Sequence, residues 1–245
     1  MRKLLRTDFT RLVKTLLFYL TLGGVTAIFY LCLFFSSAGA GESRGVAVCN
    51  TMCSLAVLLV PLVVCGAYML FVSNEFSGGA VRNKLIVGHR RTDVYLSWSV
   101  VGLVDGLIVA AVSVGSSAIL IRLFADTTGL SAKKVAVAAG IALCMLISKM
   151  CQSILLSVVV PGAKGMLVNY ILTYALLMFF VIMQDTAPDS KIVDLLARCF
   201  PEGQVTKLNI SKMPDRPWLT VLCGLGFAAL CVILGIHVFR KKDLS

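Results

Sequence analysis

Six long runs of mostly apolar residues dominate this sequence, at about residues 15–35, 46–72, 96–124, 135–160, 166–183 and 218–239. A helix needs about 20 residues to cross the hydrocarbon core of a bilayer, and inside that core every backbone amide must be satisfied within its own segment. With 58% hydrophobic and only 14% charged residues, the 245-residue chain is too apolar for a water-soluble domain. We therefore expect an all-α integral membrane protein, with one transmembrane domain of six helices over residues 1–245.

The formal net charge of +11 first suggests a nucleic-acid partner, but the positions of the basic residues argue against it. Lys and Arg in short loops set the orientation of membrane proteins, with the basic side in the cytoplasm. If the amino terminus is inside, the termini and the 74–95 loop carry most of the basic residues. We expect both termini in the cytoplasm, contact with anionic lipid, and no nucleic-acid partner.

The first fourteen residues show the pattern of a helix that lies in the membrane interface. Leu5, Phe9 and Leu12 fall on one helical face, and Lys3 and Lys14 fall on the other. The alternative is a basic flank that only orients the first span. We favour the interfacial helix because the apolar period continues up to the span.

The loop over residues 184–217 contains a second amphipathic pattern. Asp189 or Ser190 can cap a short helix, and Pro201 can end it. We expect this helix to cover the outer mouth of the bundle, with these candidate gate residues: Asp189, Ile192, Leu195, Leu196 and Phe200.

Catalytic chemistry has almost no candidates in this chain. The sequence holds two histidines and lacks a phosphate-binding loop, a zinc-protease motif and a serine-hydrolase motif. We therefore expect no enzyme activity, no metal site and no cofactor bound by this chain itself.

Two ionisable residues, Asp105 and Lys149, lie inside predicted spans, where a charge is costly enough to indicate a function. Counted from the cytoplasmic ends of their helices, both reach a similar depth, so we expect a buried ion pair between them. The alternative is that Asp105 carries a proton during transport. A wider set of acidic residues or histidines, which a proton relay uses, does not accompany it.

The largest cytoplasmic connection, residues 74–95, is rich in charge and glycine. Gly78 and Gly79 allow a turn, and the stretch AVRNKLIV is long enough for two helical turns, with Val81, Leu85 and Ile86 on an apolar face. Gly88 can end this helix. A short rigid helix between two spans would act as a lever, but the same residues also fit a solvated basic turn that serves orientation alone.

The order of these elements resembles the type-2 ATP-binding-cassette exporter permeases, and among them the small bacterial ones of lantibiotic or peptide export and self-immunity. The most specific residues of the resemblance are Glu75, Gly78, Gly79, Arg82, Asn83, Gly88, Arg90 and Arg91. It implies that residues 76–88 form a coupling helix that docks on a separate ATPase, with Lys84 and Leu85 also transmitting the movement.

The resemblance further implies two ATPase copies that bind ATP and Mg, and a second permease copy or a homologue of this chain. The path would be closed outside by helices of residues 185–213, in a bacterial plasma membrane. The expected function is export of an amphipathic peptide or a lipid-like molecule. Asp105, Lys149 and a basic loop between the third and fourth spans depart from the family pattern. Two rivals stay open: a proton-coupled secondary transporter that uses Asp105, and a non-transporting immunity or scaffold protein.

Overall fold

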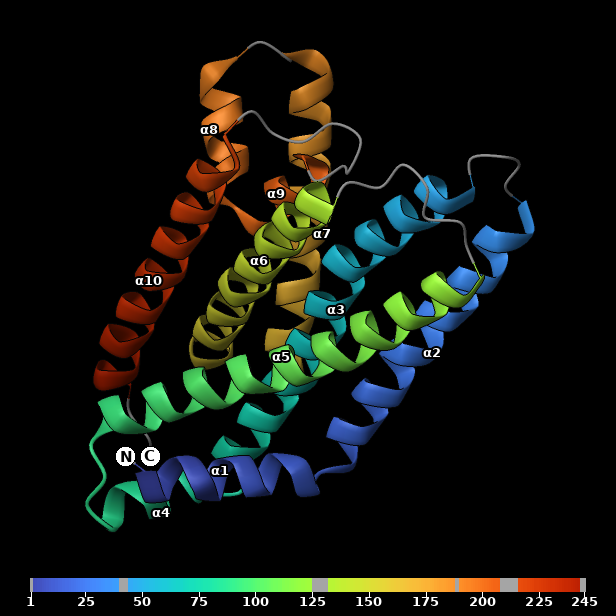
Figure 1. The fold of residues 1–245 in the computed structure, drawn as a ribbon. Helices are drawn as coiled ribbons and strands as arrows, with labels where there is room; N and C mark the ends of the chain where they lie inside the picture. The colour runs from blue at the N-terminus through green and yellow to red at the C-terminus, as the bar shows by residue number, and fades with distance from the viewer. Residues whose placement is uncertain (1, 40–43, 125–131, 188–189, 208–215, 243–245) are drawn as a thin grey trace.

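The computed structural model describes residues 2–39, 44–124, 132–187, 190–207 and 216–242, and all the regular elements in these ranges are helices (Figure 1). They are α1 (Arg2–Lys14), α2 (Leu16–Gly39), α3 (Arg44–Ser77), α4 (Ala80–Ile86), α5 (Arg91–Phe124), α6 (Ala132–Val159), α7 (Ala163–Thr186), α8 (Lys191–Cys199), α9 (Pro201–Lys207) and α10 (Pro217–Lys241). The predicted all-α class is confirmed.

Among the residues that the structure describes, five helices are long and apolar enough to cross a membrane: α3, α5, α6, α7 and α10. The described residues give a sixth if α1 and the first part of α2, with 63° between them, are counted as one broken span. The bend falls at Thr15, whose backbone amide and hydroxyl both donate to the Leu12 carbonyl, at 3.0 Å and 2.6 Å. These contacts end α1 and turn the chain into α2, so α1 lies across the end of the bundle (Figure 1).

The core is built where α3, α5 and α6 meet. Small residues of α5 let the backbones approach, since a Cβ at Gly102 would lie 2.8 Å from the Tyr68 ring and one at Gly106 would lie 3.5 Å from Leu146. The Tyr68 hydroxyl is satisfied by the Trp98 carbonyl at 2.6 Å. The two glycines of α5 therefore allow this helix to pack closely against α3 and α6.

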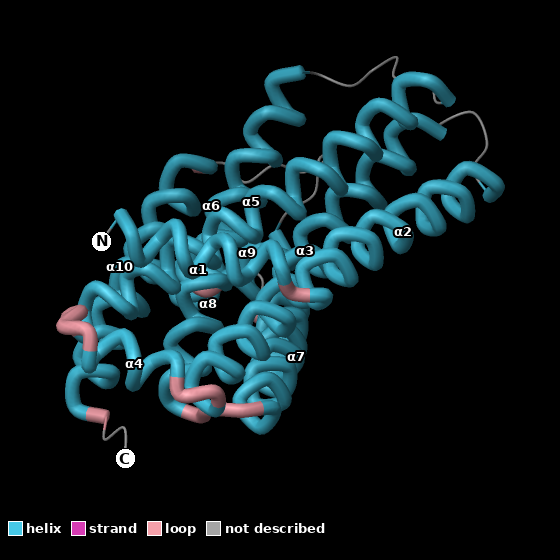
Figure 2. Tube along the Cα trace, turned by 90° about the horizontal axis from the view of Figure 1, so that it is seen from below, coloured by secondary structure: helices cyan, strands magenta, loops and turns pink. Residues whose placement is uncertain are grey.

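One end of the bundle gathers α1, α4, the start of α5 and the end of α10 (Figures 1 and 2). We call it the α4 end. The Arg91 guanidinium donates to the last carbonyls of α10, at 3.3 Å from Phe239, 3.0 Å from Arg240 and 2.5 Å from Lys242. These bonds satisfy orphan carbonyls of a helix terminus and place a cation at its negative end.

Lys242 makes further contacts at the α4 end. Its ammonium donates to the Val158 carbonyl and lies 5.2 Å from the centre of the Phe76 ring. Partial burial lowers the pKa of Lys242 from its ordinary value. Helix α8 lies towards the opposite end of the bundle (Figure 1).

Candidate functional site

Helix α4 is a seven-residue helix held between two glycines with left-handed backbones. Gly79, before the helix, has a φ of 69°, and Gly88, after the helix, has a φ of 98°. Residues other than glycine rarely adopt either backbone angle. The amide of His89 donates to the Lys84 carbonyl at 3.1 Å, and the amide of Gly88 donates to the Leu85 carbonyl at 3.0 Å, which closes the helix. The helix is shorter than the predicted 76–88, because α3 continues to Ser77.

The inner face of α4 is held by charges. The Lys84 ammonium lies 2.7 Å from Asp8 of α1 and 2.5 Å from Glu75 of α3, and Arg11 of α1 lies 3.0 Å from the other Glu75 oxygen. Ser97 of α5 donates to Asp8 at 2.7 Å. We call Asp8, Arg11, Glu75 and Lys84 the α4 charge cluster. It joins α1, α3 and α4, and the Ser97 bond extends it to α5.

The outer face of α4 is open. Ile86 is 73% exposed and Val87 is 78% exposed, and Arg82 and Asn83 are exposed beside them. An apolar pair therefore lies beside a basic and an amide side chain on this face. We call these four residues the α4 outer face.

The structure separates the residues predicted to couple to an ATPase into two groups. Arg82, Asn83, Gly78, Gly88 and Arg90 are exposed. The others face inward or are partly covered: Glu75 and Lys84 in the charge cluster, Leu85 against the core, Gly79 at the helix start and Arg91 on the end of α10. Of the predicted apolar face, Val81 and Leu85 pack inward while Ile86 points outward.

The predicted ion pair between Asp105 and Lys149 is wrong. The Lys149 ammonium lies 2.5 Å from Glu202 of α9, and it also donates to Thr173 at 2.7 Å and to Gln152 at 3.1 Å. Depth alone could not choose between Asp105 and Glu202. Sequence reasoning missed Glu202 because it took Pro201 as the end of the helix before it, whereas that proline begins α9.

Asp105 is buried in α5, with an exposed fraction of 3%. Its Oδ1 atom has no hydrogen-bond partner among the described residues, and none of the ion pairs found there includes this residue. A buried carboxyl without a cation is costly when charged.

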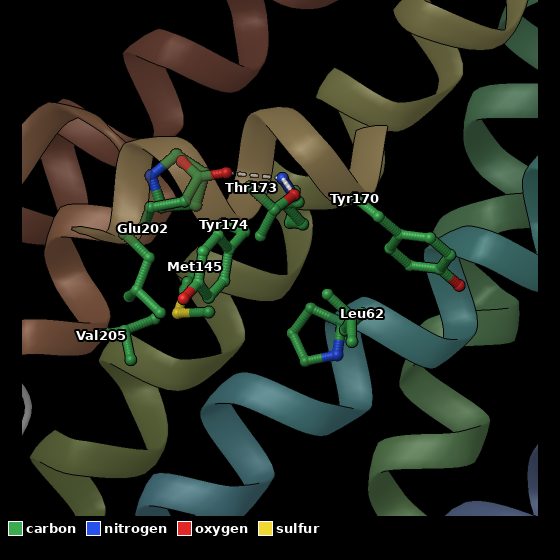
Figure 3. Close-up of a pocket in the computed structure, with 11 residues that line it drawn as sticks. Leu62, Met145, Tyr170, Thr173, Tyr174, Glu202 and Val205 are labelled. Atoms are coloured by element: carbon green, nitrogen blue, oxygen red, sulfur yellow. Dashed lines mark hydrogen bonds and ion pairs between the residues drawn. The ribbon is translucent and has the colours of Figure 1, made fainter. Parts of the chain in front are cut away.

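A cavity of about 160 Å³ lies beside the Lys149 to Glu202 pair (Figure 3). Figure 3 shows Glu202 and Val205 on one side and Leu62 and Tyr170 on the other. Four helices line it: Pro61 and Leu62 of α3; Met145 and Lys149 of α6; Tyr170, Thr173, Tyr174 and Leu177 of α7; and Pro201, Glu202 and Val205 of α9.

The helix predicted in the 184–217 loop corresponds to α8, which ends at Cys199, and a second helix, α9, begins at Pro201. Asp189 lies outside the described residues. Ile192, Leu195 and Leu196 are 73%, 51% and 40% exposed, so this apolar side is not buried within the chain. Phe200 lies between two rings, with centroids 5.9 Å from Phe180 and 5.2 Å from Phe227.

No protein-family model matches the sequence, and no curated protein matches it significantly. The fold and its apolar helices define a multi-pass helical membrane protein. Within the described ranges, no cluster of three or more His, Cys, Asp or Glu side chains is arranged to hold a metal ion.

Proposed function

We propose that this chain is the membrane-spanning subunit of an ATP-driven exporter, which moves an amphipathic peptide or a lipid-like molecule. Separate ATPase subunits would bind ATP and Mg, and a second permease copy or a homologue would complete the path. The observation that carries the proposal is the form of α4. This short helix has an apolar and basic outer face, and its inner face is tied through Lys84 to α1 and α3.

The two faces of α4 suit a mechanical role. A partner bound to Ile86 and Val87 would move α4 as a whole. Because Lys84 belongs to this helix, its ammonium would move with it. Through Asp8 and Glu75, that movement would reach α1 and the end of α3. Coupling of this kind needs a structural element with two conformations, whose equilibrium is shifted by binding at either of two separate sites. In this proposal α4 lies in the cytoplasm and α8 covers the outer end.

The test is co-purification of an ATPase with the full chain from its native membrane in mild detergent, followed by an ATPase assay. Ile86→Asp should abolish the association, because it places a charge in an apolar contact. Ile192→Asp is the matched control, since both isoleucines are 73% exposed, and it should leave the association intact. Leu85 is unsuitable for this test because it packs against the core. If no ATPase accompanies the unaltered chain, the exporter proposal fails.

A second candidate function, proton-coupled transport, is favoured by one observation, the buried and partly unpartnered carboxyl of Asp105. Such a transporter should work in vesicles without any ATPase and should stop in Asp105→Asn. The exporter should instead require the ATPase and should tolerate Asp105→Asn. Transport in reconstituted vesicles, with and without the partner, separates the two.

A further inference from the structure

The cavity beside Lys149 has one polar end and a long apolar wall. Leu62, Met145, Leu177 and Val205 supply apolar surface, and the polar end holds Lys149, Thr173 and Glu202. The Tyr170 hydroxyl is packed against Gly66 of α3, where a Cβ would collide with it, which fixes the ring in place. A mostly apolar pocket with a few converging polar groups is the usual form of a small-molecule site.

The polar end has a spare acceptor and no spare donor. A lysine ammonium has three N–H donors, and those of Lys149 are accepted by Glu202, Thr173 and Gln152. Glu202 uses only Oε1 in the ion pair. Its Oε2 is buried and has no hydrogen-bond partner among the described residues, in a side chain that is 2% exposed. A ligand group that reaches this oxygen must therefore bring a donor, and an anion would find no donor free on the lysine.

The α4 charge cluster shows what a complete version of this arrangement looks like. There Glu75 accepts Lys84 on one oxygen at 2.5 Å and Arg11 on the other at 3.0 Å. Glu202 holds Lys149 at the same 2.5 Å, but the position that corresponds to Arg11 has no cation from the described residues. A carboxylate between two cations is thus an arrangement that this fold already contains.

The cavity reaches the surface on the apolar side of the bundle. Tyr174 lines it and is 65% exposed. The neighbouring surface of α7 is apolar, with Ile171 69% exposed and Met178 37% exposed, and α7 is one of the candidate spans. A molecule dissolved in the hydrocarbon of a bilayer could therefore enter at Tyr174, whose ring face also attracts cations.

We propose that this cavity is a binding site for a cationic amphiphile, a molecule with a protonated primary amine and an apolar chain. The amine donates to Glu202 Oε2, and the chain lies along Leu62, Leu177 and Val205. The site is distinct from α4 and needs no ATPase, so it goes beyond the proposed function.

The experiment uses the purified full chain in a nonionic maltoside detergent, and native mass spectrometry counts the bound probe molecules. The probes are dodecylamine, dodecanoate and dodecanol, which share one chain length and differ in the headgroup. We expect one dodecylamine per chain, retained about tenfold more strongly than either other probe, because a charge-assisted bond forms only with the amine.

Two variants fill the cavity from different helices, Leu177→Trp from α7 and Val205→Phe from α9. Each should reduce dodecylamine retention by about tenfold. Ile182→Trp is the control, since it adds the same ring to α7 at an exposed position that does not line the cavity, and it should leave retention unchanged. Thermal unfolding checks that each variant is folded.

Glu202→Gln should remove the preference for the amine. Where that variant does not fold, the double variant Lys149→Gln with Glu202→Gln removes both buried charges and should also remove the preference. Equal retention of dodecylamine and dodecanoate, or unchanged retention in both cavity-filling variants, overturns the proposal. Absence of a co-purifying ATPase would sink only the exporter proposal, because this binding assay contains no ATPase.

Discussion

At the scale of single residues, the membrane-buried lysine of this chain is paired with a residue 53 positions away in the sequence, from Lys149 to Glu202. Removing one partner of a buried pair leaves the other charge uncompensated, which costs about 3–5 kcal/mol. Replacing both by apolar residues of similar volume is often nearly neutral. The loss of one partner should therefore change the free energy of unfolding more than the replacement of both partners.

A double-mutant cycle on unfolding in detergent tests this pairing. Lys149→Met alone should lower the free energy of unfolding by about 3 kcal/mol, and the further change Glu202→Leu should restore most of the loss. The same cycle with Asp105→Asn in place of Glu202→Leu should be additive, because Asp105 does not contact the lysine. Strong coupling to Asp105, or additivity with Glu202, would contradict the structure.

Gly235 tests how closely α10 packs against α5. A Cβ at this position would collide with the hydroxyl and ring of Tyr95, which is fully buried. Gly235→Ala should therefore lower the free energy of unfolding by about 1–3 kcal/mol, the usual cost of overpacking. Gly226→Ala on the same helix is the control, since nothing lies within 4 Å of its Cβ position. Equal stability of the two variants, measured by thermal unfolding in one detergent, would count against the packing described.

At the scale of elements, α4 owes its position to Lys84 and presents Arg82 outward. Lys84→Met leaves the carboxylates of Asp8 and Glu75 without their shared cation, so α4 should loosen from α1. Hydrogen exchange in residues 80–86 should become about tenfold faster. Arg82→Met removes the same formal charge from the exposed side and should leave the exchange unchanged. Equal exchange in both variants would show that the cluster does not hold the helix.

The existence of α4 could be predicted from its two glycines, but the direction of its faces could not. Val81, Leu85 and Ile86 are all apolar, and the period of a helix does not say which of them contacts the core. The answer depends on Asp8, because its carboxylate in α1 draws Lys84 inward and so rotates Ile86 outward. In the sequence, Asp8 looks like an isolated acid in a basic interfacial helix.

Helix α9 shows a second limit of the sequence. Seven residues with one proline and one glycine carry a weak helical signal. The helix is held by its surroundings, since a Cβ at Gly203 would lie 2.5 Å from the backbone of Ala197 and Gln204 donates to the Arg198 carbonyl at 2.8 Å. Contacts of this kind form only when α8 is already in place, so local propensity could not reveal them.

At the scale of the whole molecule, the apolar runs could be predicted well because length and hydropathy alone decide them. The bend of 63° between α1 and α2 falls at Thr15, where the predicted first run begins. Which helices pack together depends on small contacts such as Gly102 against Tyr68, and these have no long-range signal in one sequence.

The arrangement of the ends gives a prediction for the whole molecule. Helix α4 and the end of α10 lie at one end of the bundle, and α8 lies towards the other (Figure 1). In a variant whose nine cysteines are replaced, Ile86→Cys and Ile192→Cys should therefore react with a membrane-impermeant maleimide from opposite sides. The basic excess of the α4 end predicts that Cys at 192 reacts in intact cells and Cys at 86 only after lysis. Labelling of both positions in intact cells would contradict the spanning arrangement, and the reverse order would place α4 outside and remove it from any cytoplasmic ATPase.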